Sequence, residues 1–426
     1  MTRTAFNIFQ SGRGGHAFGT VLMRRLDELA RFSSERDALT RLYLSPEHKA
    51  AALQVLAWMS EAGMTAAIDP VGNVVGRYEG HTPDLPALLL GSHIDTVRNA
   101  GKYDGNLGVL ASIAAVTELH RAGEHLPFAI EVIAFGDEEG VRFPVTLTGS
   151  RAVAGTLDPA ALDAEDADGI SVREALQQFG CHPFHIPDVP RRSQDVLGYI
   201  EVHIEQGPVL EAEDLPLGIV TAINGASRFK VEVTGMAGHA GTVPMSLRKD
   251  ALAAAAEMIL TVERCGADTS ELVATVGRIE ALPGAANVIP GAARFTLDVR
   301  APADAVRIVA IHRIEREFQA IAARRSVGID MTCTYEEAAA ACAPWLIEQL
   351  EAAVSRAGIR PLRLPSGAGH DGLAMSALCP IGMLFVRCSG GISHNPAESI
   401  TAEDADVAVR ALLDFLRHLQ PAEAGH

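Results

Sequence analysis

Apolar and polar residues alternate along the chain in blocks that predict helices and buried strands in turn. Residues 21–31 and 46–62 have the apolar spacing of amphipathic helices, and Gly63 is well placed to end the second of them. Short, nearly continuous apolar runs at 85–91 and 128–135 predict strands that are buried on both faces. This alternation is typical of an α/β fold with a mostly parallel sheet covered by helices.

The same alternation continues with a predicted helix at 107–122, which Gly123 would close, and a third strand at 199–204. In open α/β sheets, sites lie beyond the carboxyl ends of the strands. Polar and acidic residues end or directly follow the three predicted strands. We therefore expect a functional site at that edge of the sheet.

The pattern changes after about Asn224. The apolar blocks then predict strand, helix, strand, strand, helix and strand, which is the split βαβ order of a small four-stranded layer. These predicted elements are residues 229–234, 247–265, 272–278, 293–300, 303–324 and 328–335.

The earlier pattern then resumes with a helix at 345–357, a strand at 381–386 and a helix at 402–419. This return indicates that the middle part of the chain is an insertion. We predict a catalytic domain formed by residues 1–222 and 336–426, and an inserted α+β domain formed by residues 223–335.

Composition narrows the classes of function. The chain has 426 residues, and its 48% hydrophobic content is ample for a sizeable core. A formal net charge of −17 argues against nucleic acid or an anionic membrane as a partner. The six cysteines form no CxxC pair, so we expect reduced thiols. Without a signal-peptide pattern or a long apolar run, the expected location is cytoplasmic.

Five segments combine imidazole and carboxylate groups at or near the predicted strand ends. They are GSHIDT at 91–96, KYDGN at 102–106, DEEG at 137–140, EVHIEQG at 201–207 and SHNPAE at 393–398. Such groups suit zinc, manganese or a similar divalent ion. A carboxylate can also bridge two cations through its two oxygens. A lone histidine is usually an ordinary residue, but five such segments together indicate a metal centre.

The segment from His93 to Asp95 predicts a supporting contact as well. Residues two apart on a strand point to the same face, so Asp95 is expected to accept the second ring N–H of His93. This hydrogen bond would fix the tautomer of His93.

The ordered motifs GSHIDTV, YDGNLGV, DEEG, HIEQGPVLE, GHAGTVPM, NVIPG, LDVRAP, SGAGHD and SHNPAE resemble the hydantoinase/carbamoylase family of amidases. This family is a branch of the aminoacylase and carboxypeptidase-type dinuclear metallohydrolases. The resemblance covers about residues 24–419. It implies two divalent metal ions, zinc or manganese, with cobalt or nickel as alternatives. It also implies that the inserted ferredoxin-like domain is a lid that pairs two protomers into a homodimer.

The resemblance further implies metal ligands. Asp104 would bridge the two ions, His93 and His203 would complete one site, and Glu139 and His394 would complete the other.

The resemblance makes Glu138 the general base, a choice between Glu138 and Glu139 that spacing alone leaves open. Related peptidases usually have a carboxylate ligand at the position of His203. The histidine here, followed by Gln206, therefore points to the amidase branch.

The substrate side is also implied by the resemblance. His239 would reach into the partner's site as an oxyanion donor, and Asn287 with Arg300 would hold a substrate carboxylate. Gln206 and His370 would contact the ureido group, with Gly369 contributing its backbone.

The expected function is hydrolysis of a ureido (N-carbamoyl) C–N bond in a small carboxylate, with release of ammonia and carbon dioxide. The segments DEEGVRFP and GSRAVAG look closest to allantoate amidohydrolases, also called allantoate deiminases. N-carbamoyl-L-amino-acid hydrolase and β-ureidopropionase are the alternatives. Two other classes stay open: a metallopeptidase or deacylase, and a non-catalytic dimeric binding protein. His203 and Gln206 count against the former, and the complete ligand set with Glu138 counts against the latter.

Overall fold

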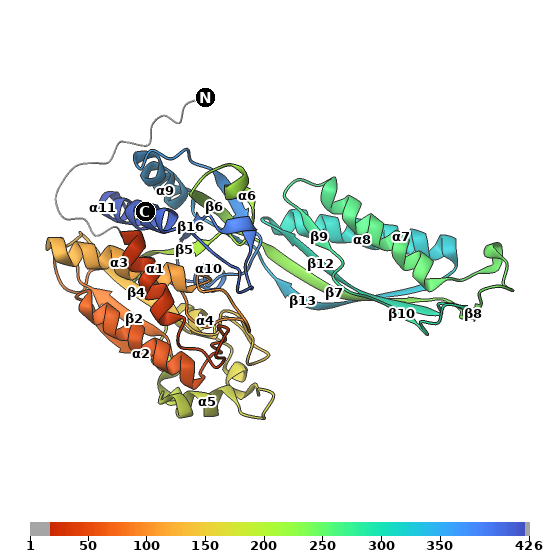
Figure 1. Ribbon diagram of the computed structural model, residues 1–426, viewed down its shortest axis with the longest axis horizontal. Coiled ribbons are helices and arrows are strands. Elements are labelled where there is room, and N and C mark those ends of the chain that lie inside the picture. The colour runs from red at the N-terminus through yellow and green to blue at the C-terminus, as the bar shows by residue number, and fades with distance from the viewer. Residues whose placement is uncertain (1–17, 422–426) are drawn as a thin grey trace. The chain divides into compact units, whose positions relative to one another are not determined.

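The computed structural model describes residues 18–421 and divides into two compact units (Figure 1). Unit 1 consists of Met1–Ile219, Pro344–Leu362 and Ala377–His426, and unit 2 of Val220–Ala343 and Arg363–Ser376. Unit 2 therefore begins and ends close to the predicted insertion. It differs from the prediction by including a second, later segment, which carries Gly369 and His370.

Unit 1 is built on a sheet in which the strands follow the order β1-β2-β4-β3-β5-β16. Strands β3, β4, β5 and β16 run parallel, whereas β1 and β2 are antiparallel additions at one edge. Every residue of β3, β4 and β16 is buried, in agreement with their nearly continuous apolar sequences. The strands are β1 (Thr65–Ile68), β2 (Val74–Tyr78), β3 (Ala87–His93), β4 (Ala129–Phe135), β5 (Val196–Ile204) and β16 (Ile381–Val386).

Helices of unit 1 pack on this sheet and on one another, with α3 against β3, β4 and β5, and α1 and α11 against α3. Ser45 caps α2 and Thr401 caps α11 through side-chain oxygens that accept backbone N–H groups, and Gly123 ends α3 in the left-handed conformation. The helices are α1 (Phe18–Leu29), α2 (Pro46–Glu61), α3 (Asn106–Ala122), α4 (Thr148–Ala154), α5 (Val172–Phe179), α6 (Val209–Ala212), α9 (Pro344–Arg356) and α11 (Ala402–His418).

The chain passes between the units within β6 (Leu217–Ile223). Two short strands pair with β6: β14 (Ala340–Ala341), which is antiparallel to it, and β15 (Arg363–Ser366). A four-residue helix, α10 (Gly372–Met375), follows β15.

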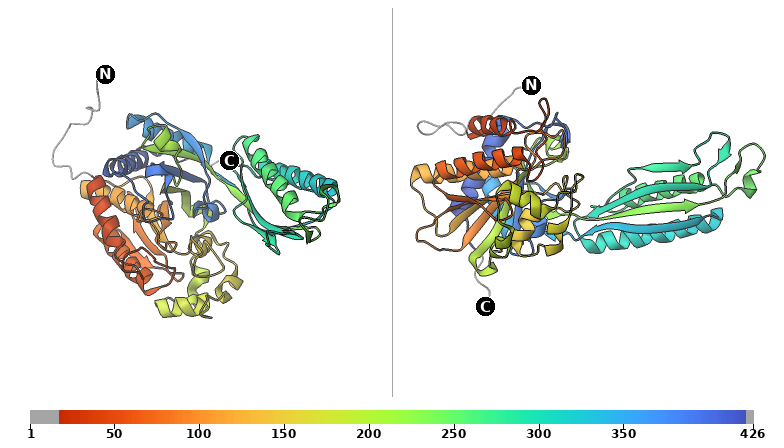
Figure 2. Two further views of the ribbon diagram at one scale, coloured as in Figure 1. Left: turned by 45° about the vertical axis from the view of Figure 1, so that its right-hand side comes forward. Right: turned by 90° about the horizontal axis from the view of Figure 1, so that it is seen from below.

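Unit 2 is an antiparallel sheet with two helices on one face (Figure 2). Its strand order is β10-β12-β7-β13, and β9 also pairs with β12. This is the arrangement of a ferredoxin-like layer, so the predicted α/β fold with an inserted α+β domain is confirmed. The elements are β7 (Gly225–Thr234), α7 (Ala251–Ala267), β9 (Val273–Thr275), β10 (Ile279–Leu282), β12 (Ala292–Ala301), α8 (Asp304–Arg325) and β13 (Gly328–Glu337).

Alanines let α7 pack closely on the sheet of unit 2, since Ala251, Ala254 and Ala255 are fully buried in its core. The helix begins at Ala251, four residues later than the sequence predicted. Asp250 is the physical reason, because its side chain accepts the N–H of Ala253 and caps the helix there. Residues Met245–Leu247 form a separate 3-10 turn.

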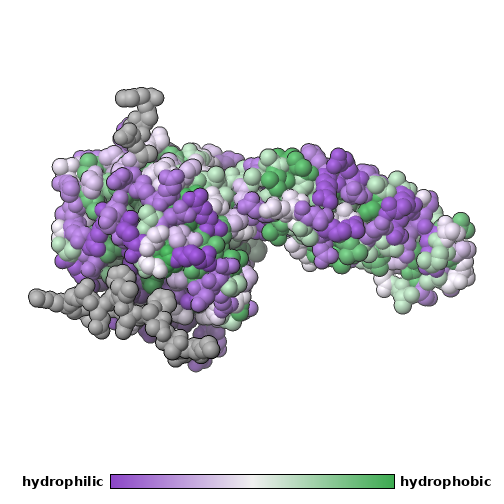
Figure 3. Space-filling model, turned by 90° about the horizontal axis from the view of Figure 1, so that it is seen from above, coloured by the Kyte–Doolittle hydropathy of each residue, from purple (hydrophilic) through white to green (hydrophobic). Residues whose placement is uncertain are grey.

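A two-stranded ribbon of β8 (Gly238–His239) and β11 (Val288–Ile289) extends unit 2 at one end. Met236, Met245 and Leu247 are exposed in this region. The space-filling view accordingly shows pale and green residues gathered at the end that carries β8 (Figure 3). Across the described part of the chain, helices are too short or too polar to cross a bilayer.

A fully buried cation, Arg41, fastens the segments around the carboxyl end of β3. Its guanidinium donates to the backbone carbonyls of Ile94 and Leu29 and to the Asn106 side chain, at 2.6–2.8 Å. Burial lowers the pKa of Arg41 to about 10, so the side chain stays charged at neutral pH. These carbonyl and amide oxygens belong to buried residues with little access to water, so each needs a donor from the protein, and Arg41 supplies one to each.

We predict that Arg41→Met destabilises the protein by on the order of 3 kcal/mol, because it leaves several buried acceptors unsatisfied. The urea midpoint of unfolding should fall accordingly. Arg24→Met is the matched control, since the Arg24 side chain is 68% exposed, and its effect should stay within about 0.5 kcal/mol. Equal midpoints for the two variants would contradict the prediction.

Candidate metal centre

The parallel strands of unit 1 bring acidic and imidazole side chains to one edge of the sheet, where their carboxyl ends meet. His93 is the last residue of β3, and His203 is the penultimate residue of β5. Glu138 and Glu139 follow β4, after Asp137 has turned the chain at a φ of +69°. His394 lies on the loop that follows β16.

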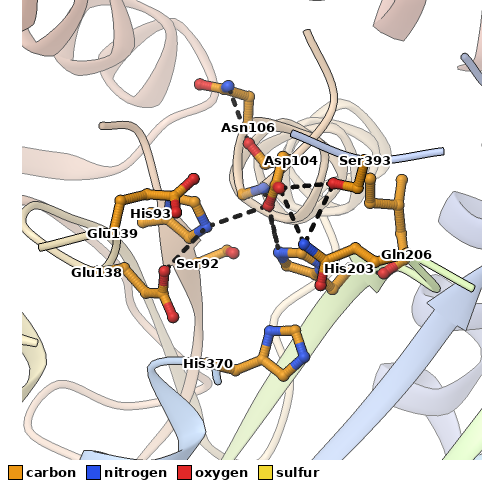
Figure 4. A network of polar contacts seen from close by, with 12 residues as sticks. Ser92, His93, Asp104, Asn106, Glu138, Glu139, His203, Gln206, His370 and Ser393 are labelled. Carbon is orange, nitrogen blue, oxygen red and sulfur yellow. Dashed lines mark hydrogen bonds and ion pairs between the residues drawn. The ribbon is translucent and has the colours of Figure 1, made fainter. Parts of the chain in front are cut away.

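The Asp104 carboxylate lies at the centre of this cluster (Figure 4). Its Oδ1 is 3.5 Å from His93 Nε2 and 3.1 Å from His203 Nε2. Its Oδ2 is 3.3 Å from His394 Nε2. One carboxylate therefore contacts imidazoles from three distant parts of the sequence, and each of its oxygens faces a different group of side chains.

Gly105 makes this close approach possible. Its φ is +65°, and a Cβ at this position would lie 2.5 Å from the His93 ring. A larger residue would therefore push His93 away from Asp104, and the backbone conformation itself favours glycine.

Two groups of potential ligand atoms share Asp104. His93, Asp104 and His203 form one group, and Asp104, Glu139 and His394 form the other, with ligand atoms within 4.8 Å of one another in each. The donors are imidazoles and carboxylates, which fit zinc, manganese and similar divalent cations. The structure thus brings together the five residues that the sequence indicated as ligands.

Electrostatics in the cluster reflect burial and mutual contact. Burial opposes ionisation of Asp104, but His203, His394 and His93 outweigh it and hold the pKa of that carboxyl well below its usual range. Burial and the neighbouring Asp104 charge raise the pKa of Glu139 to about 7. The contact with Asp104 raises the pKa of His394 to about 9. Without a cation, the cluster therefore holds protons at neutral pH.

The two adjacent glutamates have different surroundings. Glu139 Oε1 accepts the backbone N–H of Val97 at 3.3 Å, and its Oε2 is 3.6 Å from His394 Nε2. Glu138 Oε2 instead lies 3.8 Å from His93 Nε2. Glu139 thus belongs to the group that contains His394, and Glu138 forms a further group of potential ligand atoms with His93 and Glu139.

Asp95 supports His93 in a different way from the one expected. The ring Nδ1 of His93 lies 3.0 Å from the backbone carbonyl of Asp95 and 3.8 Å from its carboxylate. The carboxylate instead accepts the backbone N–H groups of Glu138 and Glu139, at 3.2 and 3.3 Å. The turn after β3 brings the carbonyl closer to the ring than the side chain, so Asp95 orients three site residues rather than one.

Gln206 lies within the cluster, three residues after His203 in the sequence. Its Nε2 donates to Asp104 Oδ2 at 2.9 Å and to Ser393 Oγ at 3.3 Å. The predicted contact of Gln206 with a ureido group stays a prediction.

The remaining predicted substrate residues belong to unit 2. His239 and Asn287 are neighbours on the β8–β11 ribbon, where Ala240 donates its N–H to the Asn287 carbonyl. The Arg300 guanidinium binds Asp298 through two nitrogens, at 2.8 and 3.1 Å, and the Gly367 carbonyl at 2.8 Å. This last bond joins Arg300 to the segment that carries Gly369 and His370, and His370 Nε2 lies 2.7 Å from Ser366 Oγ.

Sequence reasoning assigned no role to several residues that the structure places around the ligands. Ser393 Oγ lies 2.9 Å from Asp104 Oδ2, and Glu398 Oε1 accepts the backbone N–H of Asp104 at 3.1 Å. Both belong to the SHNPAE segment, so their proximity to His394 in sequence was the available signal. Nothing in the sequence pointed to Arg41, which is far from every motif.

Comparisons with known proteins agree with this geometry. The model of Peptidase family M20/M25/M40 matches residues 89–418. An N-carbamoyl-L-amino acid amidohydrolase from Geobacillus stearothermophilus is 42% identical over 95% of this chain and 99% of its own. An allantoate deiminase from Arabidopsis thaliana is 42% identical over 92% of this chain and 81% of its own.

Among solved structures, a hydantoinase/carbamoylase family amidase from Burkholderia multivorans is 33% identical. It superposes with a TM-score of 0.89 over 95% of this chain and 98% of that one. The family resemblance predicted from the sequence is confirmed. The chain belongs to Peptidase family M20/M25/M40, within its branch of hydantoinase/carbamoylase amidases.

Proposed function

We propose that the protein is an allantoate amidohydrolase (allantoate deiminase), which hydrolyses a ureido C–N bond of a small carboxylate substrate. The observation that carries the proposal is Asp104, shared between two groups of ligand atoms with the Glu138 carboxylate beside them. The allantoate deiminase and N-carbamoyl-L-amino acid amidohydrolase relatives support the same substrate class, since each covers nearly the whole chain.

The metal centre of this proposal contains two divalent cations, zinc or manganese, with cobalt or nickel as alternatives. His93 and His203 would hold one and Glu139 and His394 the other, with Asp104 shared. Bound cations supply Lewis acidity, which lowers the pKa of a water molecule and polarises the scissile carbonyl.

Glu138 is the general base of the proposed reaction. Its Oε2 takes a proton from the attacking water and delivers it to the departing nitrogen, so that the amine leaves in neutral form. The 3.8 Å distance from Glu138 Oε2 to His93 Nε2 supports this role, because it puts a carboxylate next to the ligand groups. The N–H groups of Glu138 and Glu139 both donate to Asp95, and this fixes the backbone that carries the base.

Unit 2 provides the substrate side of the proposal and acts as a lid in a homodimer. Arg300 would exchange its bidentate partner Asp298 for the substrate carboxylate, which Asn287 also holds. A cavity of about 630 Å³ in unit 2, lined by Arg300, Arg228 and Lys230 among others, gives a carboxylate access to this guanidinium. His370, Gly369 and Gln206 would contact the ureido group, and His239 of the partner subunit would stabilise the oxyanion.

N-carbamoyl-L-amino-acid hydrolysis is the second candidate, and one observation favours it. The Geobacillus stearothermophilus relative named for that activity is aligned over 99% of its own length, more than the 81% of the Arabidopsis thaliana allantoate deiminase. Both substrates carry a ureido group and a carboxylate, so the same residues serve either reaction.

We predict that Glu138→Gln lowers kcat by about 10²- to 10⁴-fold without loss of bound metal, because an amide cannot take the proton. Glu139→Gln is the matched variant one residue away, and it should lose metal as well as activity. Metal content measured by inductively coupled plasma mass spectrometry, with kcat on the best substrate, tests both. A Glu138→Gln enzyme with full turnover would refute the assigned base.

A substrate screen tests the proposed reaction itself. The metal-loaded protein is incubated with allantoate, N-carbamoyl-L-amino acids, N-carbamoyl-β-alanine and dipeptides, and ammonia or amine release is measured. We expect ammonia from allantoate at the highest kcat/KM and no cleavage of dipeptides. Highest activity on N-carbamoyl-L-amino acids would select the second candidate, and peptide cleavage without ureido turnover would refute both.

Metal binding should release protons. In the cation-free protein, the pKa of about 9 for His394 and of about 7 for Glu139 mean that both hold protons below those values. A cation in the Asp104–Glu139–His394 group must displace these two protons, so the affinity of that group should rise about tenfold per pH unit between pH 7 and 9, and more steeply below pH 7. Calorimetric titration with Mn²⁺ in buffers of different ionisation enthalpy measures the released protons. A pH-independent affinity would contradict the prediction.

A further inference from the structure

Glu398 connects the two loops that carry Asp104 and His394. Its side chain is only 4% exposed, and its Oε1 accepts the backbone N–H groups of Tyr103 at 2.9 Å and Asp104 at 3.1 Å. Its Oε2 accepts a hydrogen bond from Ser393 Oγ at 3.0 Å. One buried carboxylate therefore fixes the backbone of a shared ligand and the residue before another ligand.

Ser393 strengthens this connection. Its hydroxyl lies 2.9 Å from Asp104 Oδ2 and 3.0 Å from Glu398 Oε2, yet it has a single proton to donate. Gln206 Nε2 donates to the same oxygen at 3.3 Å, which fills an acceptor position of the hydroxyl. The Ser393 hydroxyl thus lies between the two carboxylates and donates to one of them at a time.

The ligands differ in how much support they receive from regular structure. His93 and His203 lie on central strands, and their side chains are 1% exposed. His394 lies on a loop with a φ of +53°, a conformation that residues other than glycine rarely adopt, and its side chain is 52% exposed. The position of His394 therefore depends on contacts within its loop far more than that of the other imidazoles.

We propose that Glu398 is a positioning residue that allows the Asp104–Glu139–His394 group to hold its cation. Its loss empties this group before it affects the His93–Asp104–His203 group. The inference rests on the metal centre of the proposed function. Glu398 acts through the backbone of Asp104 and through Ser393, so it need not touch cation or substrate.

Gly101 offers an independent way to displace Glu398. A Cβ on Gly101 would lie 2.2 Å from Glu398 Oε1 and 2.4 Å from Glu398 Cβ, and φ at Gly101 lies outside the left-handed region. Gly101→Ala therefore displaces the whole Glu398 side chain while leaving the glutamate in the sequence. Glu398→Ala and Gly101→Ala should have the same effect on metal binding, although they alter the site in different ways.

The test is titration of the metal-free full-length protein with Mn²⁺. Calorimetry gives the number and affinity of bound ions, and electron paramagnetic resonance separates a coupled pair from an isolated ion. We expect two ions in the wild type. In Glu398→Ala and Gly101→Ala the first ion should bind normally, and the second about 10- to 100-fold more weakly, with loss of the coupled signal. Glu398→Gln keeps an acceptor for the two N–H groups and should lie between.

Glu131→Gln is the control for loss of a buried carboxylate. Glu131 lies on β4, is 7% exposed and forms an ion pair with Arg191 at 2.8 Å. It contacts none of the proposed ligands, so this variant should still bind two ions. Circular dichroism confirms that each variant is folded. Two ions of normal affinity in both Glu398→Ala and Gly101→Ala would overturn the inference, as would equal weakening of both ions. A wild type that binds fewer than two ions would instead overturn the proposed metal centre, and the inference with it.

Discussion

The contact of one buried carboxylate with three imidazoles constrains most of unit 1. Asp104 is 4% exposed, and it lies within 3.5 Å of nitrogens from His93, His203 and His394. Removing a carboxylate from water is unfavourable unless positive charge or hydrogen-bond donors replace the solvent. The imidazoles must therefore lie close to Asp104. Their positions are set by β3 and β5, by the loop after β16 and by the turn at Gly105.

The charge of the buried Asp104 carboxylate can be compensated either by protonated imidazoles or by metal cations. Without a cation, the imidazoles carry the positive charge that Asp104 requires, and Glu139 shares in the balance through its raised pKa. The proposed metal ions would replace those protons with divalent charge. In the cation-free protein these residues would neutralise one another, and in the cation-bound protein they would hold the metal ions. Both roles require several ionisable groups at this one edge of the sheet.

Periodicity and spacing sufficed to predict the central strands, the long helices and the ligand-bearing segments. Strands such as β4 and β16 are nearly continuous apolar runs, and the ligand-bearing segments come soon after their ends, so local sequence carries the information. The capping of α7 by Asp250, the weak edge strands β1 and β2, and the bond between Arg300 and Gly367 were not predicted. The strand pairing and the Arg300–Gly367 bond depend on partners that are distant in sequence. The start of α7 depends on which of several nearby polar residues caps the helix. The contact of His93 with the Asp95 carbonyl was missed for a similar reason, because strand alternation says nothing about the turn that follows.

The insertion of unit 2 has a consequence for the order in which the protein is made. During synthesis from the N-terminus, His93, Asp104 and His203 have all been added before the first residue of unit 2. Glu139 has been added as well, but His394 and Glu398 follow only after the whole of unit 2 and β16. Between the addition of His203 and the addition of His394, a growing chain therefore contains one complete group of ligand residues and one incomplete group. The second group becomes complete only when the chain is nearly finished, so a product truncated before His394 lacks the complete Asp104–Glu139–His394 group.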